Sequence, residues 1–161
     1  MAVNVTLVLI LAATVVTGLL AGASLDKALV QLSARHRLGV IGFAAFSRAN
    51  DLGNGLIAYP LFGIGAALLT IIAALAALLQ NMPLALSAPL CISAVLALLH
   101  SLMTARAAPA MLSLRRLDDD EAALTNTFDH FARWHNRRTI LQVLNFITLV
   151  WALVAYTTFL A

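Results

Sequence analysis

Residues 118–145 read DDDEAALTNTFDHFARWHNRRTILQVLN and lead from a charged segment into the last apolar run of the chain. This stretch predicts a helix, and in a helix residues three or four positions apart lie on the same face. Four polar side chains at such steps are His135, Arg138, Gln142 and Asn145. Polar groups are costly against lipid, so this face is expected to point into a protein interior or a hydrated cavity. The sequence therefore predicts its candidate site on the inner face of the last helix.

The composition of the chain is that of an integral membrane protein. Of its 161 residues, 62% are apolar and only 11% are charged, a balance far from that of globular proteins. No charged residue occurs in 1–25, 52–105 or 139–161. About 20 apolar residues cross a bilayer core, so the middle run forms two spans around the polar turn at 80–83. We expect one all-α domain, a four-helix membrane bundle with spans at about 3–23, 55–79, 84–103 and 139–160.

The basic residues support this division and predict its orientation. All ten Lys and Arg lie in 26–54 and 104–138, the two loops that a four-span chain places on one side. Basic loops stay in the cytoplasm, so we expect both termini and the 80–83 turn outside, in a bacterial inner membrane. The excess of basic residues is then mainly a sign of membrane topology, and it also attracts membrane lipids with anionic headgroups. A nucleic-acid partner is not expected, because the chain has no soluble basic face with base-reading groups.

Two features of the first loop bear on the fold and the site. Ala28–Phe46 is basic and amphipathic. It is expected to lie at the cytoplasmic headgroups, with apolar positions such as Leu38 and Phe43 turned inward. Asn50 and Asp51 then lie against the mouth of the second span. Asp51 suits either of two roles there, as the cap of the helix that begins the span or as part of a site.

The start of the chain also has two interpretations. Ala21-Gly22-Ala23 has the small residues of a signal-peptide cleavage site, after an apolar run of suitable character. No Lys or Arg precedes that run, however, and cleavage would leave the basic first loop outside the cell. We therefore expect the first apolar run to be retained as a membrane span.

The histidines and the single cysteine leave several roles open. His100 lies near the cytoplasmic end of the third span, level with the polar face of the last helix. A structural hydrogen bond is the more usual role of a histidine there, and chemistry is the alternative. His130 and His135 are five positions apart and do not form the i, i+4 pair of a helical zinc site. The alternative is a metal or haem site that draws His36, His100, His130 and His135 from different segments, and the spacing does not require it. Cys91 excludes an intrachain disulfide and is expected to be a small buried side chain.

Four motifs are spread over nearly the whole chain. They are the small-residue exit of the first span at 18–26, the loop Arg35-His36-Arg37-Leu38-Gly39, the stretch 48–55, and FARWHNRRT at 131–139 before the last apolar run. In these motifs the chain resembles the anthrone oxygenase-like membrane family, whose bacterial members are mostly grouped as domain-of-unknown-function family 1772. The resemblance implies a four-span bundle. Fungal members are implicated in oxygenating polyketide anthrones to anthraquinones without flavin or haem, so it also implies an oxygenase that needs no cofactor.

This reaction assigns roles to the polar residues. An anthrone is a flat, apolar carbon acid, and its oxidation needs a base for the C–H proton and donors that hold the anion. The expected catalytic residues are His135 or His100 as the base and Arg138 as the donor. The expected substrate-binding residues are Trp134 and Tyr59 as a stacking wall, Asn145 beside Arg138, and Gln142, Asn50 and Asp51.

The alternative is a non-catalytic bundle that binds a lipid or an apolar small molecule, or that serves as a subunit of a homo-oligomer or a larger membrane complex. Spans rich in Gly and Ala suit such helix association. Convergence of the polar groups on one pocket favours ligand binding or chemistry, whereas outward dispersal favours a packing role. A transporter is not expected, because four spans leave little room for a path and the sequence has no inverted repeat.

Overall fold

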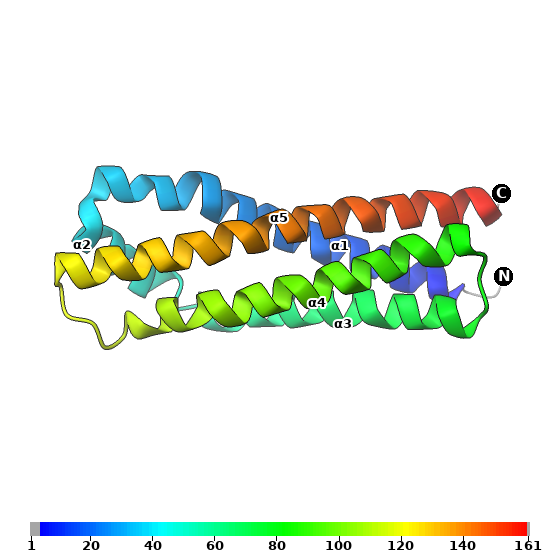
Figure 1. The fold of residues 1–161 in the computed structure, drawn as a ribbon, viewed down its shortest axis with the longest axis horizontal. Coiled ribbons are helices and arrows are strands. Elements are labelled where there is room, and N and C mark those ends of the chain that lie inside the picture. The colour runs from blue at the N-terminus through cyan, green and yellow to red at the C-terminus, as the bar shows by residue number, and fades with distance from the viewer. Residues whose placement is uncertain (1–3, 161) are drawn as a thin grey trace.

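The computed structural model describes residues 4–160, and within them the chain is all-α (Figure 1). The elements are α1 (Val5–Asp26), the π-helix η1 (Lys27–Gln31), α2 (Leu32–Asn50), α3 (Gly55–Leu79), α4 (Leu84–Ser113) and α5 (Glu121–Leu160). In the described part of the chain, four helical stretches are long and apolar enough to cross a membrane. The predicted helical bundle with four membrane-crossing helices is confirmed at this level, and the chain is a small integral membrane protein.

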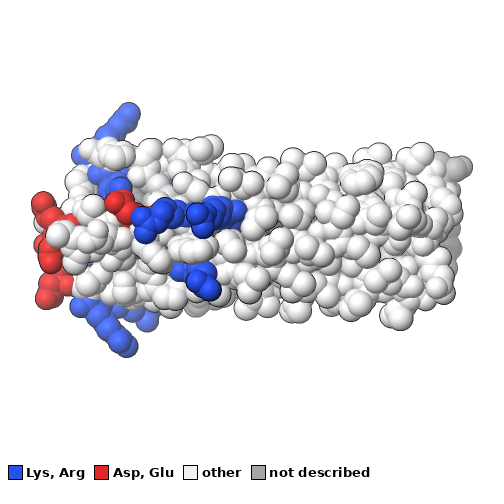
Figure 2. Space-filling view, in the orientation of Figure 1, with Lys and Arg blue, Asp and Glu red and all other residues white. Residues whose placement is uncertain are grey.

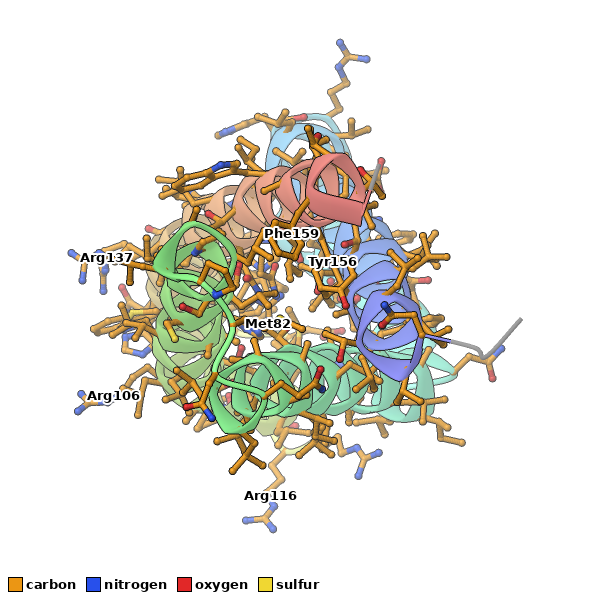
Figure 3. All side chains as sticks on the ribbon, turned by 90° about the vertical axis from the view of Figure 1, so that its right-hand side faces the viewer. Met82, Arg106, Arg116, Arg137, Tyr156 and Phe159 are labelled. Carbon is orange, nitrogen blue, oxygen red and sulfur yellow. The ribbon has the colours of Figure 1, made fainter. Side chains whose placement is uncertain are left out.

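The bundle is formed by α1, α3, α4 and α5. Viewed along its axis, α5 lies beside α1, α1 beside α3, α3 beside α4, and α4 beside α5 (Figure 3). The bounds of α3 are those expected for the second span, and it ends where the polar turn begins. Asn81 takes a positive φ of 51° in this turn, and Pro83 starts α4 without needing a backbone donor.

A packed apolar cluster fills the bundle toward the termini. It contains Ile10 and Ala13 of α1, three alanines of α3, Leu86 and Leu90 of α4, and Leu149, Ala152 and Tyr156 of α5. Hydrogen bonds fasten this end, since the Tyr156 hydroxyl donates to Asn4 Oδ1 (2.9 Å) and Gln80 Nε2 donates to Thr6 Oγ1 (2.7 Å). The interior is thereby closed at the end that carries the termini.

At the opposite end, the chain differs from the expectation for the first loop. α1 does not stop at residue 23 but continues through η1 into α2, and Gln31 Nε2 donates to Asp26 Oδ2 (2.6 Å) across the π-turn. Inside α2, Gly39 takes φ 71° and ψ 164°, a conformation that essentially only glycine adopts. The expected single surface segment is therefore two helical halves, of which the second turns back toward the bundle (Figure 1).

The second half of α2 packs on protein. Phe43 is fully buried, and its ring centroid lies 4.9 Å from that of Phe128 on α5. Leu38 is exposed on the surface of the bundle, where contact with the membrane stays a prediction. The apolar residues of this segment thus divide between a protein core and the outer surface, because the break at Gly39 changes the direction of the helix.

The charged residues gather at the end of the bundle away from the termini (Figure 2). Among the described residues, ion pairs link elements at this end: Lys27–Asp51 (2.5 Å), Arg35–Asp129 (2.7 Å) and Arg48–Asp119 (2.8 Å). Asp120 caps α5 by accepting from the Ala122 backbone N–H at 2.9 Å. Both charged loops lie at the same end, as four spans require, and the side of the membrane that this end faces stays a prediction.

Candidate functional site

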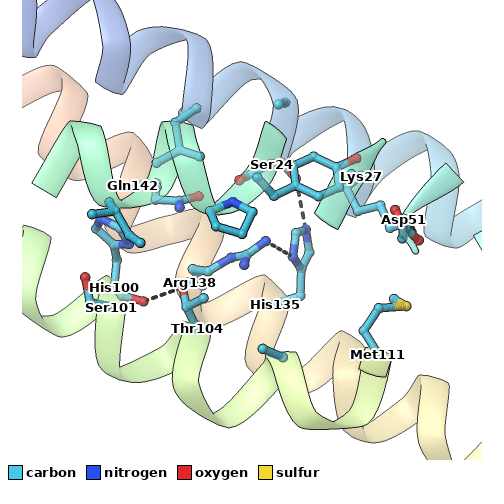
Figure 4. A pocket seen from close by; sticks show the side chains of 18 of the residues that line it. Ser24, Lys27, Asp51, His100, Ser101, Thr104, Met111, His135, Arg138 and Gln142 are labelled. Atoms are coloured by element: carbon cyan, nitrogen blue, oxygen red, sulfur yellow. Dashed lines mark hydrogen bonds and ion pairs between the residues drawn. The ribbon is translucent and has the colours of Figure 1, made fainter. Parts of the chain in front are cut away.

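A cavity of about 620 Å³ lies inside the bundle near its charged end, and it receives side chains from all four long helices (Figure 4). Most of its lining is aliphatic or small. The polar and ionisable side chains in the lining are Ser24, Lys27, Asp51, Tyr59, His100, Ser101, Thr104, His135, Arg138 and Gln142. An apolar chamber with a few convergent polar groups is the usual form of a small-molecule site.

The cavity opens sideways through the bundle wall. Most of its exposed lining residues are on two adjacent helices, namely Tyr59, Pro60, Ile64 and Leu68 on α3 and Ser101, Ala105 and Leu112 on α4. The lining side chains from α5 are buried or half-buried. The mouth between α3 and α4 is rimmed largely by apolar side chains at the height of a membrane span. Such a rim suits a molecule that is dissolved in lipid.

The polar wall is organised around His135 of α5, whose two ring nitrogens are both engaged. His135 Nε2 lies 3.1 Å from the Ser24 carbonyl oxygen of α1, and Nδ1 lies 2.7 Å from Arg138 Nη2. A carbonyl only accepts, so Nε2 carries the hydrogen and donates it. Nδ1 then accepts from the guanidinium, which fixes a neutral imidazole. Phe131 stacks on the ring at 5.1 Å between centroids.

Arg138 brings an uncompensated positive charge to this wall. Its guanidinium lines the cavity and donates to a neutral imidazole, and its Nε has no hydrogen-bond partner among the described residues. The ion pairs found in the described part of the chain do not include it. A guanidinium in an apolar chamber gains most from an anion, because the low dielectric strengthens the attraction. The cavity is thus suited to a ligand that carries or develops negative charge.

His100 of α4 differs from His135 in that neither of its buried ring nitrogens has a hydrogen-bond partner among the described residues. It lines the same cavity and is only 2% exposed. Figure 4 shows it beside Gln142, whose Oε1 also lacks a partner. Unpaired buried polar atoms are uncommon in native proteins and call for a bound group or water. Asn145 lies one turn deeper on α5 and is fully buried. Neither its side-chain nitrogen nor its side-chain oxygen has a hydrogen-bond partner among the described residues.

Lys27 and Asp51 form the charged-end wall of the cavity. Their ion pair is buried, with both side chains about 5% exposed, and Lys27 Nζ also lies 5.8 Å from the Phe43 ring centroid. Asp51 therefore does not cap α3. The residue before that helix is Asn54, which makes no side-chain cap hydrogen bond. The capping interpretation is wrong because a buried lysine competes for the same carboxylate.

The expected site residues separate into two groups. The cavity brings together Tyr59, Asp51, His100, His135, Arg138 and Gln142. Three others lie outside its lining: Asn50 is exposed and donates to Asp51 Oδ1, Asn145 lies deeper in the bundle, and Trp134 is half-buried between two arginines. Sequence reasoning missed Lys27. The signal for it was its step of three from Ser24 on the small-residue face of α1.

The described residues contain no group of three or more His, Cys, Asp or Glu side chains placed to hold a metal ion. Comparisons of the chain with protein-family models, with curated proteins and with solved structures find no match.

Proposed function

We propose that this protein is a small membrane oxygenase that acts on an apolar aromatic carbon acid, in the manner of the anthrone oxygenase-like family that its motifs resemble. One observation carries the proposal: a guanidinium without a carboxylate partner, Arg138, and an imidazole without hydrogen-bond partners among the described residues, His100, line one largely apolar cavity. The first group suits a developing anion and the second suits a proton. An anthrone needs both.

In this proposal His100 is the base, since both nitrogens of His135 are already engaged. His100 removes a proton from the acidic CH₂ group, and Arg138 holds the negative charge that spreads to the ketone oxygen. The carbanion carbon forms a bond to O₂, and the proton returns from His100 to the resulting peroxide. Loss of water leaves a C=O group. One oxygen of O₂ ends in the product and the other in water, so O₂ is the only oxidant required.

His135 acts in this scheme as a positioning residue. Its Nδ1 holds Arg138 Nη2 at 2.7 Å, while the bond to Ser24 ties the pair to α1. This assignment predicts that His135→Gln lowers kcat by a smaller factor than His100→Gln does, because the guanidinium that stabilises the anion is displaced but not removed, while the base remains. His100→Gln is expected to lower kcat by about 100-fold or more, the usual contribution of a general base. Equal kinetic effects of the two substitutions would contradict the division of roles.

The decisive experiment measures O₂ uptake and anthraquinone absorbance with purified protein in nanodiscs and anthrone as substrate. Protein-free nanodiscs correct for spontaneous oxidation. Arg115→Gln is the matched control for loss of an arginine, because Arg115 is exposed and does not line the cavity. Turnover that falls in His100→Gln and Arg138→Gln but persists in Arg115→Gln is the expected result. Uptake no faster than in empty nanodiscs would refute the oxygenase.

The second candidate is a binding protein for an apolar anion, which the uncompensated charge of Arg138 also favours. Anaerobic equilibrium dialysis with anthrone and with a long-chain fatty acid separates the two. Binding of the fatty acid that is lost in Arg138→Gln, together with no catalysed O₂ uptake, would identify the non-catalytic alternative.

A further inference from the structure

Trp134 of α5 is half-buried beside the apolar cluster at the charged end of the bundle, and an arginine from each of two helices lies against its ring. The guanidinium carbon of Arg106 on α4 is 5.8 Å from the indole centroid, and that of Arg137 on α5 is 4.8 Å from it. Figure 3 shows both arginines pointing outward on the same side of the bundle. Both distances are in the range of a cation–π contact, so one indole ring has two positive charges beside it.

These two arginines differ from the basic residues that stabilise the fold. Lys27, Arg35 and Arg48 are held by carboxylates, but neither Arg106 nor Arg137 is among the ion pairs of the described residues. Both are exposed. Their donors are therefore available to an acceptor from outside the chain, and the pair of charges favours an anionic one.

The surface below the two arginines is apolar. At helical steps from Arg106, the exposed residues of α4 are Leu102, Leu99 and Val95, and at helical steps from Arg137 those of α5 are Ile140, Leu144 and Ile147. α4 and α5 pack against each other extensively, so the two rows border one shallow surface. This surface lies within the apolar spans, while the arginines and the indole lie where a membrane-water boundary is expected.

We propose that Arg106, Arg137 and Trp134 form a binding site for one anionic phospholipid. The two guanidiniums hold the phosphate, the indole supports them at the height of the glycerol backbone, and the acyl chains lie along the two apolar rows. An anionic headgroup is favoured over a zwitterionic one because the sequence has no Asp or Glu in 95–117 or 130–147 that could pair with a choline or ethanolamine cation. A free phosphate lacks the apolar part that the surface would cover.

Native mass spectrometry of the full chain in mild detergent tests this site, with phosphatidylglycerol, phosphatidylcholine and inorganic phosphate as separate additives. Wild-type protein is expected to retain one phosphatidylglycerol preferentially. Arg106→Gln/Arg137→Gln is expected to bind it at least about tenfold more weakly, from the loss of two interfacial charges. The matched control is Arg115→Gln/Arg116→Gln, which removes the same charge beyond the end of α4 and is expected to stay within about twofold of wild type.

If both double variants lose phosphatidylglycerol equally, the attraction depends on total charge and the site is overturned. Equal retention of phosphatidylcholine, or binding of inorganic phosphate alone, would also overturn it. If the Arg106→Gln/Arg137→Gln protein does not fold, a photoactivatable phosphatidylglycerol is used on wild type. Crosslinks confined to peptides that cover 95–106 and 137–147 are expected, and crosslinks elsewhere would contradict the proposal. Neither outcome depends on whether the cavity catalyses a reaction.

Discussion

The buried ion pair of Lys27 and Asp51 forms one wall of the cavity. Removal of one partner from a buried ion pair leaves an uncompensated charge and typically costs about 3–5 kcal/mol. We therefore expect Asp51→Asn to lower the thermal unfolding midpoint strongly in detergent. A Lys27→Met/Asp51→Leu double variant is expected to recover most of that loss, because an apolar pair of similar volume leaves no buried charge.

The control for this prediction is the partly exposed pair Arg35–Asp129, where water screens the charges. Asp129→Asn is expected to change the stability by less than about 1 kcal/mol. If Asp51→Asn and Asp129→Asn shift the midpoint equally, the Lys27–Asp51 pair does not carry the stabilising role assigned to it.

At this scale the sequence predicted the inward polar face of the last helix well. Helical spacing was sufficient, since His135, Arg138, Gln142 and Asn145 are all buried or half-buried. Helical spacing could not show which of His135 and His100 has free ring nitrogens. The hydrogen-bond partner of His135 is a backbone carbonyl on another helix, distant in sequence. Trp134 is next to His135 in sequence but points about 100° away around the helix, which places it outside the cavity.

At the scale of elements, the wide mouth between α3 and α4 makes the route of ligand entry testable. Ala105→Trp places a large ring at the exposed rim and is expected to weaken anthrone binding about tenfold or more, with little change in the unfolding midpoint. Leu98→Trp is the matched control, since Leu98 is exposed on α4 and does not line the cavity. Anaerobic equilibrium dialysis measures both. Normal binding to Ala105→Trp would place the entrance elsewhere.

The elements also show which boundaries were predictable. The bounds of α3 follow from an apolar run that ends at Gln80 and Asn81, and the sequence predicted them. The continuation of α1 into α2 was not predicted, because polar residues at 24–27 were interpreted as an exit from the membrane. Ser24 and Lys27 are instead buried against other helices. The break at Gly39 depends on a positive φ, which the sequence permits without requiring.

For the whole molecule, the charged end and the end with the termini must lie on opposite sides of the membrane. In a Cys91→Ser background, single cysteines at Ser33→Cys and Asp118→Cys report the charged end and Asn81→Cys reports the turn. An impermeant maleimide on intact cells is expected to label only Asn81→Cys, and the other two only after lysis. The opposite pattern would invert the orientation, and labelling of Asn81→Cys together with either of the others in intact cells would contradict four spans.

The cavity has a lateral mouth, and beyond its deep polar residues the interior is packed up to the termini. It is a recess and not a passage. The packed cluster leaves this cavity no route through the described part of the bundle to the end with the termini, which fits entry and exit on one side of the bilayer. Under the proposed oxygenase function, turnover then follows the amount of substrate partitioned into lipid, and a more water-soluble analogue is a poorer substrate even when it fits the chamber equally well.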